Sequence, residues 1–113
     1  NAIAARLRDG MQQILTKHAV AGAVYGDAST FHIYLGKAGR GSIEGLTAAQ
    51  LKGIPKKTVV ALQQALRVRG VDLMSSTGGL TSLAHTDADV RETLEAFDDT
   101  VRDLLAEEVL ERL

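Results

Sequence analysis

Cysteine is absent from the sequence, and proline occurs only once, at position 55. Without cysteine the chain has no disulfide, no thiolate metal ligand and no thiol nucleophile, and its redox compartment cannot be inferred. The longest apolar runs are far shorter than the ~20 residues that span a bilayer. No basic and then apolar leader opens the chain. We therefore expect a protein of the cytoplasm with no membrane segment.

The charge of the chain is nearly balanced. The 13 Lys and Arg residues oppose 14 Asp and Glu residues, which gives a formal net charge of −1. This balance gives no electrostatic reason to expect binding to nucleic acid or to an anionic membrane. The 113 residues, 45% of them hydrophobic, suffice for one globular domain with a single core. Asn1 in place of an initiator methionine is expected if the chain was cut from a longer polypeptide.

The first third of the chain predicts a helix and a hairpin. Residues 2–18 form an amphipathic pattern, and 20–25 and 30–35 read as strands joined by a Gly-Asp-Ala-Ser turn. Gly10 costs the helix ~1 kcal/mol relative to alanine, and we favour the close approach of another element as its reason. His32 should point away from the core, because it alternates with apolar neighbours. The apolar residues of the two patterns are Ile3, Leu7, Met11, Ile14, Leu15, Phe31, Ile33 and Leu35.

Residues 36–45 contain four glycines and two cations. A phosphate-binding loop would place Gly-Lys-Ser/Thr at its end, before a helix. Here Gly36-Lys37 opens the segment and no hydroxyl residue follows the lysine. A flexible loop within the domain is therefore favoured over a nucleotide site.

The middle of the chain predicts two helical segments. Thr47 is placed to cap a short helical turn at 46–51. Pro55 then marks the boundary before a helix at 57–69. The buried face of that helix is expected to carry Val59, Leu62 and Leu66.

The last third contains a helix end, two short strands and a long helix. Gly70 closes the preceding helix. Two strands are expected at 71–74 and 80–84, on either side of a bend at 75–79. Thr86 then caps the final helix. If that helix continues to Leu113 it extends ~39 Å, so its end at 107–113 should overhang the domain or pack on something absent from this chain. Its apolar stripe consists of Val90, Leu94, Phe97, Val101, Leu104 and Leu105. The fold class is α+β, with a small, mainly antiparallel sheet of about four strands covered by helices on one face.

No catalytic or metal constellation is visible in the sequence. The three histidines, His18, His32 and His85, fall in separate elements without metal-ligand spacing. For His85 a structural role in the turn is favoured over catalysis. The acidic residues gather on one face of the last helix, which favours a solvated surface. The hydroxyl residues near the bend have no base close in sequence.

The stretch from Ala65 to Phe97, with "LRVRGVDL" and "LTSLAHTDADVRETLEAF", resembles the C-terminal end of class III pyridoxal-phosphate aminotransferases. The branch that it resembles most is glutamate-1-semialdehyde 2,1-aminomutase. In that branch three motifs follow one another: a helix that ends L-x-x-x-G-V, a strand that ends S-x-A-H-T, and a helix with the pattern D-x-D-V/I-x-x-T-L. "ARLRDGMQQIL" at 5–15 is similar to the helix that begins the family's small domain. "GDASTFHIYL" at 26–35 is similar to its G-S-M-F-x-I-F-F strand.

This resemblance implies that residues 1–113 form the C-terminal small domain of a longer enzyme, with the architecture found in fold-type I PLP enzymes. In such enzymes pyridoxal 5'-phosphate is held by a large domain, whose lysine forms the Schiff base. None of the lysines here lies in a similar motif, so no catalytic, cofactor-binding or metal residue is assigned. The isolated chain is expected to be inactive. Its implied partners are the large domain of the same polypeptide and, at full length, a second copy in a homodimer.

The positions that the resemblance places toward the substrate are Ser76, Thr77, Gly78 and Gly79. The aminomutase branch typically shows S-x-F-E-x-x-F here, so Thr77 stands where that branch has an acid. Small residues at this point leave room for a bulkier or less polar substrate. The alternative hypothesis is a free-standing α+β interaction or ligand-sensing module whose long last helix pairs with a partner.

Overall fold

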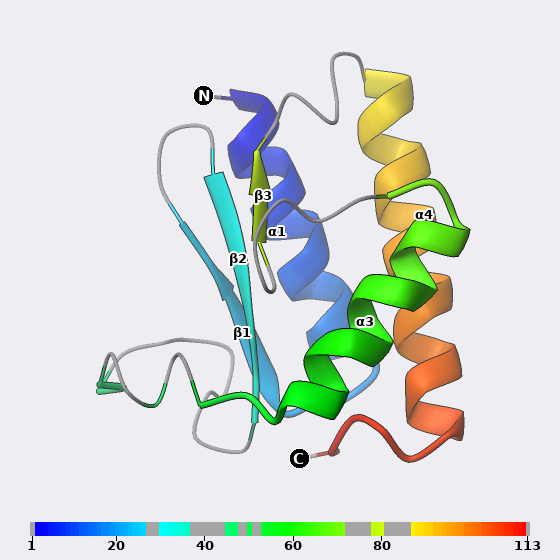
Figure 1. The fold of residues 1–113 in the computed structure, drawn as a ribbon. Coiled ribbons are helices and arrows are strands. Elements are labelled where there is room, and N and C mark those ends of the chain that lie inside the picture. Colours follow the sequence, from blue (N-terminus) through cyan, green and yellow to red (C-terminus); the bar gives the residue numbers. More distant parts are fainter. Residues whose placement is uncertain are drawn as a thin grey trace.

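The computed structural model describes residues 2–26, 30–36, 45–47, 50, 53–71, 78–80 and 87–112, and its architecture is shown in Figure 1. Three strands form one antiparallel sheet in the order β1-β2-β3, with the helices on one side of it. The fold is therefore α+β, as predicted. The helices are α1 (Ala2–Lys17), α3 (Lys56–Val68) and α4 (Asp87–Ala106), and the strands are β1 (Gly22–Tyr25), β2 (Thr30–Leu35) and β3 (Gly78–Leu80).

The predicted hairpin is confirmed by the pairing of β1 with β2, in which Tyr25 lies opposite His32 and Gly22 opposite Leu35. The core-facing residues Phe31, Ile33 and Leu35 of β2 are buried. His32 is half-buried on the opposite face, where its ring stacks on that of Tyr25 with centroids 5.2 Å apart. Tyr34 shares the face of His32 and is also buried, at 7% exposure. The alternation therefore sets which side chains share a face of β2, but the second face is not open throughout.

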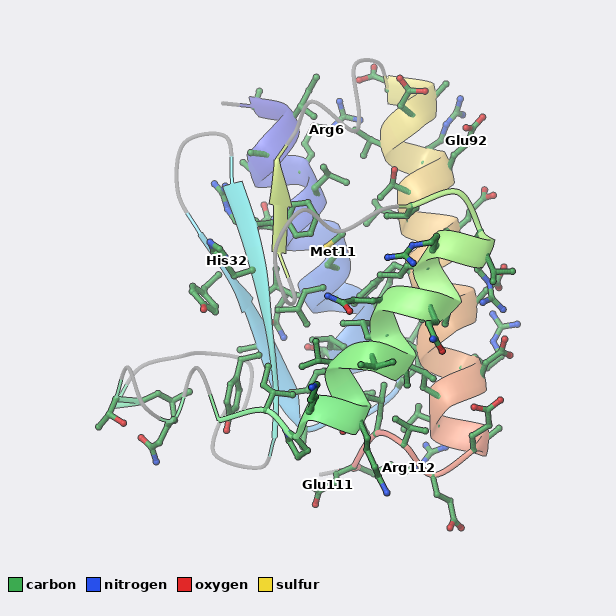
Figure 2. All side chains as sticks on the ribbon, viewed as in Figure 1. Arg6, Met11, His32, Glu92, Glu111 and Arg112 are labelled. Atoms are coloured by element: carbon green, nitrogen blue, oxygen red, sulfur yellow. The ribbon has the colours of Figure 1, made fainter. Side chains whose placement is uncertain are left out.

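The helices form a layer against the sheet. Helix α1 packs on β1, β2 and α4, and α3 packs on α4. Gly10 of α1 lies against Leu94 of α4, and a β-carbon at Gly10 would stand 2.6 Å from Leu94 Cδ1. The expectation that Gly10 permits a close approach is confirmed. Met11 points from α1 into the core and is 1% exposed (Figure 2).

All three helices end in the same hydrogen-bonded turn. The second residue past each described helix adopts a positive φ: Ala19 (54°), Gly70 (86°) and Glu108 (60°). The amide of the next residue, a valine in each case, donates to the carbonyl of a leucine five positions earlier, and this is the Schellman arrangement. The side chains of these leucines and valines belong to the hydrophobic core or pack against it. The three pairs are Leu15–Val20, Leu66–Val71 and Leu104–Val109, with N···O distances of 2.9, 2.9 and 2.8 Å.

The prediction that the last helix reaches Leu113 and overhangs is wrong. Helix α4 ends at Ala106, because the left-handed Glu108 reverses the chain. The returning segment buries Leu110, and Arg112 pairs with Val20 beside the sheet. The amide of Ala21 donates to the carbonyl of Glu111 over 2.8 Å. The end of the chain is therefore part of the folded domain.

The prediction that Gly78 and Gly79 lie in a bend is also wrong. Both belong to β3, where Gly78 pairs with His32 and Gly79 with Phe31. The strand expected at 80–84 therefore begins two residues earlier, and its continuation past Leu80 lies outside the described residues. Of the strand expected at 71–74, only Val71 is among the described residues, and it is buried.

Helix α3 begins after Pro55 and ends at Val68, close to the predicted limits. It buries Leu62 and Leu66 as expected, but the third buried side chain is Thr58, while Val59 is half-buried. Thr47 accepts a hydrogen bond from the amide of Gln50 at 3.1 Å, and Gln50 Oε1 accepts one from the amide of Thr47 at 2.8 Å. This reciprocal capping box confirms Thr47 as a cap.

Candidate functional site

The four positions predicted to face a substrate are only partly within the described residues. Ser76 and Thr77 lie outside them. The backbone of Gly78 and Gly79 forms β3 beside the half-buried His32. His32 projects from the sheet on the side away from the helices (Figure 2). The substrate-facing role of these four positions stays a prediction.

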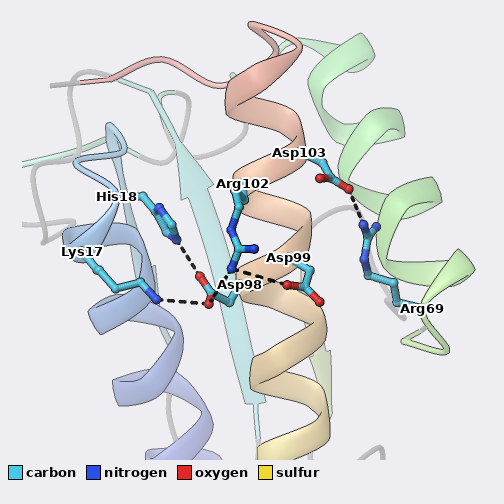
Figure 3. Close-up of polar contacts among 7 residues, drawn as sticks. All are labelled: Lys17, His18, Arg69, Asp98, Asp99, Arg102 and Asp103. Carbon is cyan, nitrogen blue, oxygen red and sulfur yellow. Dashed lines mark hydrogen bonds and ion pairs between the residues drawn. The ribbon is translucent and has the colours of Figure 1, made fainter.

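The described part of the chain contains one cluster of ionisable groups around Asp98 of α4 (Figure 3). His18 Nε2 lies 2.6 Å from Asp98 Oδ1, and Lys17 Nζ donates to Asp98 Oδ2 over 3.1 Å. Arg102 Nη2 lies 3.4 Å from the same oxygen of Asp98 and 3.6 Å from Asp99 Oδ1. The side chains of His18 and Asp98 are 18% and 21% exposed. The carboxylate thus joins the end of α1 to the middle of α4.

The cations around Asp98 favour its ionised form. The hydrogen bond from His18 lowers the pKa of this carboxyl below its usual value, and Lys17 adds to the effect while partial burial opposes it. The expectation that the acidic residues of α4 form a solvated surface is therefore wrong for Asp98. Its partners Lys17 and His18 lie 81 and 80 positions away in the sequence, so local spacing gives no sign of these two contacts.

Two further ion pairs connect the helices. Arg6 of α1 pairs with Asp87 in the first turn of α4, and this contact lowers the pKa of the Asp87 carboxyl. Arg69, just past α3, pairs with Asp103 and also donates to the carbonyl of Ala65 over 3.1 Å. Within the described residues, no group of three or more His, Cys, Asp or Glu side chains is placed to hold a metal ion.

A furrow of about 320 Å³ runs between α3 and α4. We call it the α3–α4 furrow. It is open because Ala61 and Ala65 are too small to fill the space beside Leu104. Neither His18 nor Asp98 lines it, so the ion cluster and the furrow are separate features. The lining residues are Ala61, Gln64, Ala65, Val68, Arg69, Asp103, Leu104 and Glu107.

A smaller cavity of about 40 Å³ lies beside the end of β2, between Leu35, Pro55, Thr58 and Leu110. Its volume is enough for one or two water molecules. Neither cavity contains a lysine. Lys17 pairs with Asp98, and Lys56 and Lys57 are exposed in the first turn of α3. Neither of these two cavities therefore offers a lysine to the cofactor that the sequence resemblance implies.

The other positions singled out in the sequence give no site. His85, Lys52 and all of 37–44 lie outside the described residues, so the loop at 36–45 stays a prediction. Among the described residues, none of the helices has the length and apolar character to cross a membrane.

Comparisons with known proteins support the fold. No protein-family model matches the chain, and no curated protein matches it significantly. Among solved structures, the fold is similar to part of an omega-transaminase from Sphaerobacter thermophilus, with a TM-score of 0.70 and 22% sequence identity. The similarity covers 90% of this chain but only 23% of the transaminase chain. This chain therefore has the fold of about a quarter of that protein.

Proposed function

We propose that this chain is the C-terminal small domain of a class III pyridoxal-phosphate enzyme that transfers amino groups. The observation that carries the proposal is the fold shared with a segment of an omega-transaminase over 90% of this chain. The ordered sequence resemblance from Ala5 to Phe97 supports the same assignment independently, because it rests on motifs and not on the backbone.

In this proposal pyridoxal phosphate is bound by a large domain of the same polypeptide. The cofactor serves as an electron sink when bound, and the lysine that carries it belongs to that domain. The small domain contributes a wall at the substrate end of the pocket, formed by Ser76, Thr77, Gly78 and Gly79. The full-length enzyme is proposed to be a cytoplasmic homodimer.

The finer assignment concerns the outcome of the reaction. We propose an enzyme similar to glutamate-1-semialdehyde aminomutase in its C-terminal motifs but with a different substrate. No acid occurs at 76–79, the stretch in which the aminomutase branch has one. A less polar substrate, or transfer between two molecules, is compatible with these small uncharged residues. Product analysis separates migration of an amino group within one molecule from exchange between two.

The experiment that tests the proposal compares the 113-residue chain with the polypeptide encoded by its whole reading frame. Each is incubated with pyridoxal phosphate and reduced with borohydride, and modified lysines are mapped by peptide mass spectrometry. We expect one stoichiometric adduct on a lysine outside 1–113 in the whole polypeptide. We expect no specific adduct on Lys17, Lys37, Lys52, Lys56 or Lys57.

A reading frame that encodes no additional cofactor domain would refute the proposal. A stoichiometric adduct on one lysine of this chain would refute the assignment of a silent domain. The alternative of a free-standing module drew its support from the apolar stripe and the overhang of the last helix. The stripe is largely buried within this domain, and α4 ends at Ala106.

A further inference from the structure

We infer that the α3–α4 furrow is a self-association surface, in which α3 of a second copy of this chain lies antiparallel to α3 of the first. The inference goes beyond the proposed function and does not depend on it. It rests on an exposed apolar side chain, a furrow of matching character and the charges around both.

The exposed side chain is Val68, in the last turn of α3. Its 85% exposure is unusual for a large apolar residue, and among the described residues Val60 is the other such case at 37%. Helix α3 carries Lys56, Lys57 and Arg67 and no acidic residue. Val68 is therefore an apolar side chain on a basic helix, available for contact outside its own domain.

The furrow has the complementary character. Its apolar lining consists of Ala61, Ala65 and Leu104, together with Val68 of the same copy. Its α4 side carries Asp103, which is paired with Arg69, and the exposed Glu107 one turn later. A suitable occupant presents one medium-sized apolar side chain with a cation beside it. Val68 and the adjacent Arg67 have this chemistry.

Helix geometry places the two features at the spacing that a twofold pair requires. Ala61 and Val68 are seven residues apart on α3, or about 10 Å along the axis. If two copies of α3 cross antiparallel at Ala65, Val68 of each lies opposite residue 62 of the other, between Ala61 and Ala65. Arg67 of each copy then comes near Glu107 of the other. The contact repeats itself by symmetry, as in an isologous interface.

The size of this contact sets its strength. Stable dimers bury about 1,600 Å² in total, and one helix pair with its flanks covers less. We therefore expect a weak dimer whose population rises with protein concentration. Small alanines at the crossing allow close backbone approach, so the pair is specific in geometry.

Sedimentation velocity and concentration-dependent amide chemical shifts of the 113-residue chain test the inference. We expect a monomer–dimer equilibrium, with shift changes confined to α3 and the last two turns of α4. Val68→Glu should abolish the dimer, because it places a charge on the apolar floor and beside Glu107 of the other copy. Gln13→Glu adds the same charge at an exposed position of α1 and should leave the equilibrium unchanged.

A charge exchange tests the proposed orientation. Arg67→Glu and Glu107→Arg should each weaken the dimer at least tenfold in dissociation constant, and the double variant should restore most of the loss. Circular dichroism confirms that every variant is folded. A chain that is monomeric at every concentration overturns the inference, as does a dimer unaffected by Val68→Glu. Failure of the double variant to restore association overturns the antiparallel arrangement.

The outcome is independent of the cofactor experiment above. If Val68 is protected from solvent in the longer polypeptide while the isolated chain stays monomeric, another part of that polypeptide covers the furrow. That result would refute self-association and leave the proposed enzyme function standing.

Discussion

Lys17 of α1 and Asp98 of α4 are 81 positions apart in the sequence, and their side chains meet at 3.1 Å. Arg6 and Asp87, near the starts of the same two helices, are separated by the same 81 positions and also form an ion pair. The equal separation means that α1 and α4 run parallel and advance residue for residue between the two contacts. Gly10 and Leu94 lie between them and let the helices approach closely. Two charged contacts and one small residue thus fix the register of the helix layer.

Replacing Asp98 should lower stability in a pH-dependent way. Because its hydrogen bonds lower the pKa of the folded carboxyl below the ordinary value of 3.8, the unfolded state binds more protons in that range and stability rises with pH. The contribution of Asp98 is present above pH ~4 and is lost as the pH falls through the lower pKa of the folded state. We expect Asp98→Asn to cost about 1 kcal/mol at neutral pH.

Urea denaturation at pH 7 and at pH 3 measures this effect. The difference between Asp98→Asn and the unmodified chain should shrink at the lower pH. Asp99→Asn serves as the control, because Asp99 is exposed and its contact with Arg102 is 3.6 Å; its effect should stay near zero at neutral pH. An Asp98→Asn difference that is the same at both values would show that charge on Asp98 does not matter.

Gly10 should be coupled to Leu94. Gly10→Ala removes a helix penalty of about 1 kcal/mol, but the new β-carbon would stand 2.6 Å from Leu94 Cδ1. Crowding in a packed interface costs about 1–3 kcal/mol, so we expect net destabilisation. In a Leu94→Ala background the obstacle is gone, and Gly10→Ala should stabilise. A double-mutant cycle of urea midpoints gives the coupling energy, and additive effects would contradict the observed contact.

The helices, the hairpin and the buried face of β2 could be predicted because each depends on neighbours in sequence. Thr47 and Gly70 were also recognised, since both residue types mark helix ends. The end of α4 was missed because Glu108 occupies the left-handed position that glycine marks in α3. The strand at Gly78–Leu80 was missed because its pairing with β2 is distant in sequence. Two features depend on tertiary packing, and no local pattern encodes either. One is the hydrogen bond between His18 and Asp98, and the other is the α3–α4 furrow.

At the left-handed residues that follow the three helices, we expect glycine to raise the free energy of unfolding and alanine to lower it. Ala19 and Glu108 hold φ values of 54° and 60°, whereas Gly70 holds 86° without a side chain. A left-handed conformation costs a non-glycine residue about 1–2 kcal/mol. Because all three residues are exposed, we expect Ala19→Gly and Glu108→Gly each to stabilise the chain by up to about 1 kcal/mol. Gly70→Ala should destabilise by a similar amount.

Thermal and urea unfolding of the three single variants measure these effects. At Gly70 an added β-carbon would have no atom within 4 Å, so a loss there reports backbone strain and not a clash. Gln13→Gly, in the exposed middle of α1, is the control and should destabilise by about 1 kcal/mol. Loss of stability in Glu108→Gly would show that the turn after α4 is not held in the left-handed conformation.

Thr100 of α4 should be more stable as valine. Its side chain is fully buried, and its hydroxyl has no hydrogen-bond partner among the described residues. An unsatisfied buried hydroxyl costs about 1–3 kcal/mol, and valine keeps the β-branched shape while replacing the hydroxyl with a methyl group. We therefore expect Thr100→Val to raise the free energy of unfolding by about 1 kcal/mol. Thr100→Ser keeps the hydroxyl and removes the methyl group, so it should destabilise the chain. If valine destabilises as much as serine does, the hydroxyl of Thr100 has a partner in solution, and hydrogen exchange of the α4 amides in the two variants would locate the affected turn.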